Sequence, residues 1–211
     1  MKVHKIGHCC LVIDVDGLRI LTDPGAYTDK QNQIQKIDVI AITHEHLDHL
    51  HIESLKKVLV KNPRSTIITN NAVGKILLQK NIKYDLLGHN KKKKFKNVLI
   101  EGFGKLHADI YSTVPRVENT GYFIANKLFY PGDALTDPGK KVEILALPVA
   151  GPWLTLGQAI DYSKRIKPKK CFPVHDGMLK FLGPVHFLPE KVLGDFGSKF
   201  IPLEAGESTQ F

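Results

Sequence analysis

The stretch Thr43-His44-Glu45-His46-Leu47-Asp48-His49 places three imidazoles and the Asp48 carboxylate within six residues. It follows the apolar run from Val39 to Ile42, which is typical of a strand buried on both faces. It precedes residues 52–59, where apolar side chains recur at helical spacing. The motif therefore occupies a loop between a buried strand and a helix, where open α/β folds place their chemical groups. Imidazole and carboxylate are ligands of zinc, manganese and iron, so we predict a metal site.

The composition is that of an ordinary globular protein, with 43% hydrophobic and 24% charged residues in 211. That length predicts one domain spanning residues 1–211. No apolar run approaches the roughly 20 residues that span a bilayer, and the first residues do not resemble a secretory signal. Two of the three cysteines are adjacent and none forms a CxxC pair, so we expect reduced thiols and a cytoplasmic protein.

A net charge of +9 leaves two interpretations open, an anionic partner or simple solubility. The densest run is Lys91-Lys92-Lys93-Lys94-Phe95-Lys96, which we interpret as a solvated loop. Few aromatic residues interleave with these lysines, so a stacking platform for single-stranded nucleic acid is not indicated. Nucleic acid stays an alternative partner, behind a small anionic substrate.

Hydrophobic patterning predicts many short strands with helices between them. Strands are expected at 8–15, 18–22, 38–43, 65–69, 83–87, 98–104, 108–113, 121–125, 128–130, 142–147 and 170–174, and helices at 52–59, 70–80, 155–166 and 189–193. Each half of the chain passes from strands into a strand–helix unit. This echo predicts two β-rich halves sandwiched between helices.

Further acidic and histidine residues lie at the ends of other segments, where they could join the opening motif. Asp133 and His175 directly follow apolar strands, Asp23 stops a strand, and His107 ends the segment Gly104-Lys105-Leu106-His107. Asp23 is interpreted either as a turn residue or as a carboxylate that orients the metal loop.

The chain resembles the metallo-β-lactamase superfamily through these residues. The family's HxHxDH motif is matched by His44, His46, Asp48 and His49, and its later single ligands by His107, Asp133 and His175. Finer features resemble the branch of ascorbate-6-phosphate lactonase-like and phospholipase-D-like hydrolases. These features are Gly7-His8, Leu21-Thr22-Asp23-Pro24, Asn119-Thr120-Gly121-Tyr122, Pro131-Gly132-Asp133-Ala134 and Leu145-Ala146-Leu147-Pro148.

The resemblance implies an α+β fold with two mixed sheets packed face to face and helices on both outer sides, an αββα sandwich. It also implies a role for each residue and an activity. His44, His46 and His107 would hold one divalent ion, Asp48, His49 and His175 a second, and Asp133 would bridge both. Zinc is the first choice of metal, with manganese and iron as alternatives. A hydroxide bridging the ions would attack an ester, lactone or phosphodiester, with Asp48 also orienting the water. Such a site keeps a small positive charge and favours anionic substrates.

Other functions remain as alternatives. Asp133 stands where the best-known lactamases of the family carry a cysteine, which argues against dedicated lactam hydrolysis. A ribonuclease or a promiscuous β-lactamase of the same fold is the next hypothesis, and a metal-binding sensor without activity comes after it.

Several other residues carry weaker expectations. His8 either faces the metals as an outer support or is a buried polar side chain, and His51 is expected to be exposed. His186 or Tyr111 could protonate a leaving group, whereas Asp176 should point away from the site. Trp153 lines the pocket or packs in the core, and Cys9, Cys10 and Cys171 are expected in the core.

Overall fold

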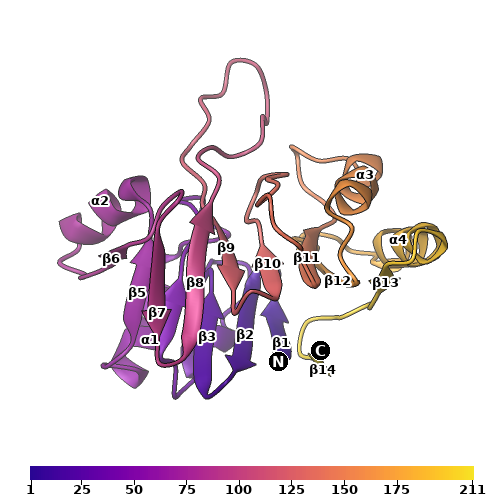
Figure 1. Cartoon of the computed structure of the whole chain (residues 1–211). Coiled ribbons are helices and arrows are strands. Elements are labelled where there is room, and N and C mark those ends of the chain that lie inside the picture. Colours follow the sequence, from indigo (N-terminus) through magenta and orange to yellow (C-terminus); the bar gives the residue numbers. More distant parts are fainter.

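Two seven-stranded mixed sheets pack face to face in the computed structural model, which describes residues 1–211 (Figure 1). The first sheet has the order β14 (Ser208–Gln210), β1 (Lys2–Gly7), β2 (Cys10–Val15), β3 (Leu18–Thr22), β4 (Val39–Ala41), β5 (Thr66–Thr69), β6 (Asp85–Leu86). The second has the order β13 (Lys199–Phe200), β12 (Lys170–Val174), β11 (Ile144–Pro148), β10 (Leu128–Tyr130), β9 (Gly121–Ile124), β8 (Val98–Phe103), β7 (Lys92–Phe95).

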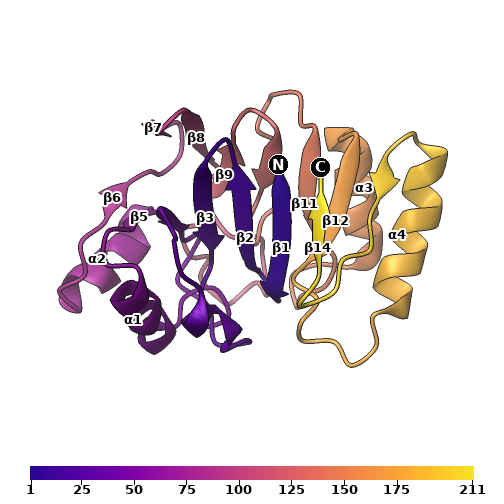
Figure 2. The ribbon, with the colours of Figure 1, turned by 90° about the horizontal axis from the view of Figure 1, so that it is seen from below.

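Helices cover both outer faces, so the predicted αββα sandwich is confirmed. The helices are α1 (Ile52–Lys61), α2 (Asn71–Gln79), α3 (Leu156–Ile166) and α4 (Gly183–Asp195), with a short 3-10 helix η1 (Lys30–Gln33). Figure 2 shows α1 and α2 on one side of the strands and α3 and α4 on the opposite side. One apolar cluster fills the space between the sheets, a second joins sheet residues to α3 and α4, and a third joins them to α1 and α2.

Each sheet is half antiparallel and half parallel, and this pattern decides where the strand ends lie. In the first sheet β3, β4, β5 and β6 run parallel, and in the second β10, β11, β12 and β13 do. Parallel neighbours end at the same sheet edge, so residues that follow β3, β4, β10 and β12 come out on shared edges. The two halves thus repeat one architecture, as the sequence pattern predicts.

Some predicted elements are wrong. Residues 108–113 form an exposed loop instead of a strand, and the backbone N–H of Ala108 donates to the carbonyl of Asp133. The lysine run is the edge strand β7 and not a loop, because an edge strand has only one neighbour and tolerates charged residues. The expected helix 189–193 is the second half of α4, which continues through the buried Pro189.

The first strand was not predicted, because its alternation is broken by a buried lysine. Lys5 on β1 is 1% exposed, and its ammonium contacts the Asp176 carboxylate at 2.7 Å. It also donates to the carbonyls of Pro173 (2.9 Å) and Leu203 (3.0 Å). These contacts fasten β1 to the end of β12. Pro173 lies two residues before His175, and Asp176 directly follows it.

We predict that Lys5→Met lowers the free energy of unfolding by about 3 to 5 kcal/mol, because it removes the ammonium from the buried Asp176 carboxylate and leaves it only the His186 ring at 3.3 Å. Lys56→Met removes the exposed Lys56–Glu53 pair on α1 and is the matched control, expected to leave the stability nearly unchanged because exposed ion pairs contribute little. Urea unfolding measures both variants. Equal stability of the two would contradict this interpretation of Lys5.

Candidate metal centre

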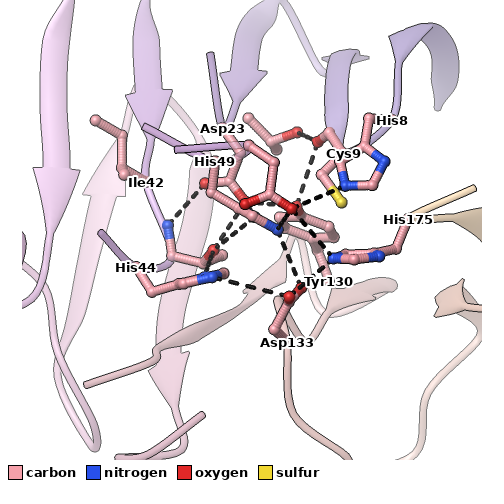
Figure 3. Close-up of polar contacts among 12 residues, drawn as sticks. His8, Cys9, Asp23, Ile42, His44, His49, Tyr130, Asp133 and His175 are labelled. Atoms are coloured by element: carbon pink, nitrogen blue, oxygen red, sulfur yellow. Dashed lines mark hydrogen bonds and ion pairs between the residues drawn. The ribbon is translucent and has the colours of Figure 1, made fainter. Parts of the chain in front are cut away.

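The predicted site residues meet at one edge of the sandwich, although they come from six segments of the chain (Figure 3). Asp23 directly follows β3, and the motif from His44 to His49 follows β4. His107 lies in the loop between β8 and β9, Asp133 in the loop after β10, and His175 directly after β12. His8 occupies the turn between β1 and β2.

The predicted ligand atoms form two separate groups, in each of which all atoms lie within 4.8 Å of one another. One group consists of His44, His46 and His107, and the other of Asp48, His49, Asp133 and His175. This is the division that the family resemblance implies. The identity of the ligands themselves stays a prediction.

Asp133 lies between the two groups and contacts imidazoles of both. Its Oδ1 is 3.1 Å from His49 Nε2, and its Oδ2 is 2.9 Å from His175 Nε2. The same Oδ2 is 3.3 Å from His107 Nε2 and 3.8 Å from His44 Nε2. Trp153 Nε1 donates to Oδ2 at 3.0 Å, and the Asp133 N–H donates to Asn119 Oδ1 at 3.1 Å.

The ring nitrogens that point into the centre are buried, and their short contacts with the Asp133 carboxylate do not have hydrogen-bond geometry. These atoms are Nε2 of His44, His49, His107 and His175, together with Oδ1 of Asp133. Buried polar atoms are ordinarily paired, and each unpaired one requires an explanation. Nitrogen and carboxylate oxygen are the donor set of a divalent metal, so the residues present fit such an ion.

Three of these imidazoles are fixed with the Nδ1 atom protonated, which leaves Nε2 free to bind a metal. His49 Nδ1 donates to Asp23 Oδ2 at 2.7 Å, and His107 Nδ1 donates to the Ala108 carbonyl at 2.6 Å. His44 Nδ1 lies 3.0 Å from Thr43 Oγ1, which in turn donates to Asp23 Oδ2 at 2.8 Å. Such outer partners set the orientation and basicity of metal-binding histidines.

Asp23 is therefore more than a turn residue. It is fully buried, has a positive φ of 35°, and accepts from Thr43 N at 2.8 Å. The hydroxyl of Tyr130 on the opposite sheet also donates to it, at 2.5 Å. Neither Thr43 nor Tyr130 was predicted to support the site. The sequence does hold a signal for Thr43, because this hydroxyl residue directly precedes His44.

Burial and neighbouring charges set the protonation of the cluster. Burial, with the imidazoles of His49 and His107, holds the pKa of His44 well below its usual value, so this ring is neutral. Burial opposes ionisation of Asp133, but His49 and His175 outweigh it and hold the pKa of the carboxyl well below its usual range. Burial disfavours the charged ring of His175, but the negative charges of the Cys9 thiolate and Asp133 outweigh burial and raise the pKa of His175 to about 10. A divalent ion must displace the proton from such a ring.

His8 and Cys9 lie behind the second group. His8 Nε2 is 3.1 Å from Asp48 Oδ2, so His8 contacts a predicted ligand from outside the cluster. His8 adopts a positive φ of 41°, and its carbonyl accepts from the His175 N–H at 3.2 Å. Cys9 is buried as expected, yet its sulfur falls within 4.8 Å of ligand atoms of His8, His49 and His175, a placement that the sequence did not predict.

Some of the expectations for the remaining residues are confirmed and others are wrong. Asp176 points away from the site toward Lys5, as predicted. His186 contacts that same Asp176 at 3.3 Å, so it does not reach the centre. The expectation that His51 is exposed is wrong, because it is half-buried with Nδ1 2.9 Å from Ser54 Oγ. Trp153 both packs in a core cluster and lines the site.

Arg116 is the cationic side chain beside the cluster, where its Nε donates to the His107 carbonyl and lies 3.3 Å from Asp109 Oδ1. A pocket of about 170 Å³ opens onto the cluster, and no lysine or arginine lines it. A larger cavity of about 670 Å³ includes Arg19, Lys61 and Arg64. It lies beside the start of β3 and β4, at the opposite edge from the metal cluster. We therefore take the smaller pocket as the candidate site, because the donor atoms converge there.

We predict that Asp23→Asn weakens binding of zinc by about 10- to 100-fold, because an amide cannot accept four hydrogen bonds and orient His49 as the carboxylate does. Asp14→Asn alters an exposed carboxylate on β2 and should leave zinc affinity unchanged. Competition with a chromophoric chelator measures both. Equal affinity in the two variants would show that Asp23 does not support the ligands.

Comparison with known proteins agrees with this fold and cluster. A model of the beta-lactamase superfamily domain matches residues 2–175. Protein Rv0786c of Mycobacterium tuberculosis is 28% identical over 184 residues, which cover 85% of each chain. A UPF0173 metal-dependent hydrolase of Flavobacterium johnsoniae is 25% identical over 228 aligned positions that cover both chains fully.

A solved structure gives the same result. A provisionally named metal-dependent hydrolase of Parabacteroides distasonis is 26% identical and superposes with a TM-score of 0.78, covering 96% of this chain and 92% of that one. No helix of the present structure has the length and apolar character needed to cross a membrane. The chain belongs to the beta-lactamase superfamily and has the metallo-β-lactamase fold of metal-dependent hydrolases.

Proposed function

We propose that this chain binds two divalent ions and hydrolyses an ester, lactone or phosphodiester bond of a small anionic substrate. The position of Asp133 carries this proposal, because its two oxygens contact imidazoles of both ligand groups. A single ion would leave one of these groups without a function. A shared carboxylate is the feature that holds two ions roughly 3.5–4 Å apart in hydrolytic two-metal sites.

When bound, the ions would supply a water ionised near neutral pH and an electrophile for the substrate oxygen. The protein's part is to keep the site rigid. Trp153 and the Asn119 side chain hold Asp133 from two directions. The Asp48 carboxylate, 17% exposed, is the acidic side chain of the pocket that is best placed to orient a water. His8 fixes one oxygen of Asp48 from behind.

Zinc is the metal we favour. All the nitrogen donors of the two predicted sites are imidazoles, and their oxygen donors are carboxylates; Cys9 belongs to neither ligand group. Manganese and iron share this preference for nitrogen and oxygen, so elemental analysis of the purified protein decides between them. The three cysteines are free and buried, which suits a reducing compartment, and we retain the cytoplasm as the proposed location.

A ribonuclease is the less supported alternative. The lysines at positions 92–94 are exposed on the edge strand β7, and none lines the pocket at the metal cluster. Phosphate contacts by lysine make nucleic-acid binding strongly dependent on salt. A panel of a phosphodiester, a lactone, RNA and a chromogenic lactam, assayed with metal-loaded protein, separates the hydrolase, the nuclease, the lactamase and a sensor without activity.

We predict that Asp133→Ala reduces bound zinc from two ions per chain to one or none and lowers hydrolysis of bis-(p-nitrophenyl) phosphate at least about 1000-fold, because the bridging carboxylate is lost. His46→Ala should also lose one ion. His51→Ala removes a neighbouring imidazole outside the cluster and should keep both ions and the activity. Full activity of Asp133→Ala would refute the proposal.

A further inference from the structure

Six large apolar side chains are exposed on four loops of the chain. They are Tyr27 (49% exposed), Leu47 (61%), Tyr111 (67%), Val114 (45%), Met178 (45%) and Phe181 (74%). The loops follow β3, β4, β8 and β12, and all of them carry predicted ligands or lie beside them. Figure 1 shows the longest of these loops, between β8 and β9, projecting beyond the end of the strands.

These side chains do not contribute to the interior of the protein. None of the six belongs to one of the three apolar core clusters. Single exposed apolar residues are ordinary, but several gathered at one opening mark a binding surface. The four loops start at the sheet edge where the ligands converge, and Tyr27, Val114 and Met178 line hollows beside the ligands.

The pocket at the metal cluster connects these residues to the ligands. Its apolar walls are Tyr27, Ile110, Pro152, Trp153 and Met178, and its floor is made by His46, Asp48, His107, Asp133 and His175. Ile110 and Val114 also line a smaller adjoining hollow beside His46 and His107. One side of the opening is thus apolar and the other consists of metal-ligating groups.

Two of the apolar walls are held in place. The Tyr27 ring packs on the His8 ring with centroids 4.8 Å apart, and His8 is itself fixed by Asp48. The Trp153 ring meets the rings of His107 and His175 edge-on, at 5.6 and 5.7 Å, and its Nε1 is bonded to Asp133. Because these walls are already ordered, little conformational entropy is lost when a complementary group binds to them.

We propose that the substrate is amphiphilic, with an apolar group the size of a phenyl ring or a short alkyl chain next to the bond that is hydrolysed. This inference rests on the proposed function and specifies its substrate class. An apolar cavity of roughly 150 Å³ accommodates a benzene-sized group, and the pocket of about 170 Å³ has that scale. The anionic part would lie over the ligands, and the apolar part would contact Tyr27, Trp153 and Met178.

The lack of lysine and arginine in the pocket supports the same substrate class. An extended polyanion needs cationic side chains along its path, and no lysine or arginine lines the pocket. Arg116 lines the adjoining hollow, but its Nε already donates to the His107 carbonyl and pairs with Asp109. The ions are therefore the main anion-binding groups, which suits one charged centre attached to an apolar group.

Binding of n-alkylphosphonates from methyl to hexyl to zinc-loaded protein, measured by calorimetry, tests this inference without requiring turnover. Each methylene buried against the pocket should tighten binding up to about fourfold, so we expect at least about a tenfold gain from ethyl to hexyl. The kcat/KM values of p-nitrophenyl alkyl phosphodiesters should rise with chain length in the same way.

Variants locate the effect. Met178→Ser and Tyr27→Ser should flatten the dependence on chain length, read as the ratio of hexyl- to ethylphosphonate affinity within each variant. Val60→Ser changes an 81% exposed apolar residue on α1 and is the matched control, expected to keep the full dependence. A dependence that survives in Met178→Ser and Tyr27→Ser would contradict the assigned pocket.

Other outcomes would overturn the inference. Affinity that is flat or undetectable at every chain length excludes an apolar subsite. Dimerisation in sedimentation that Leu47→Ser abolishes would assign the apolar residues to contacts between copies, and binding to phosphatidylcholine vesicles would assign them to a membrane surface. Failure of the proposed function is distinguishable, because it appears as fewer than two zinc ions per chain whatever the chain length of the ligand.

Discussion

One buried carboxylate, that of Asp23, holds the two halves of the site together. It accepts hydrogen bonds from the backbone and hydroxyl of Thr43, from the His49 ring, and from the Tyr130 hydroxyl on the other sheet. A buried carboxylate is costly unless it is fully paired, so the strand ends that supply these donors are constrained to one arrangement. That arrangement orients His49 directly and His44 through Thr43, and so turns a sheet edge into a preformed cluster.

The apparent excess of positive charge is less informative about function than the local surroundings of the site. A net charge of +9 suggests an anionic partner, yet the lysines lie on β7 and around a cavity at the opposite edge. At the metal cluster the surroundings are apolar and aromatic. The metal ions themselves would be the positive charges that a substrate meets, with Tyr27, Trp153 and Met178 selecting what is attached to the anionic centre.

Much of the fold could be predicted from short-range pattern, because continuous apolar runs such as Ile144 to Pro148 mark buried parallel strands. Strand β1 could not, since the burial of Lys5 depends on Asp176, which is 171 residues away. The edge strand β7 could not be predicted either. Its lysines are typical of a strand with a neighbour on one side only, but in the sequence the same run is typical of a loop. Residues at strand ends were found because acidic and histidine side chains there stand out from apolar runs.

The supporting residues were harder to predict than the ligand candidates. Tyr130 and Asn119 carry no motif of their own, and their contacts with Asp23 and Asp133 depend on how the two sheets pack. The same holds for Cys9, whose thiol is one residue from His8 in sequence but reaches the cluster only through the turn at His8.

The central claim is that Asp133 is shared by two metal ions, and anomalous diffraction from crystals grown with zinc tests it most directly. We predict two peaks roughly 3.5–4 Å apart on either side of Asp133, one against His44, His46 and His107 and the other against Asp48, His49 and His175. A single peak, or peaks that leave Asp133 without a metal contact, would contradict the account.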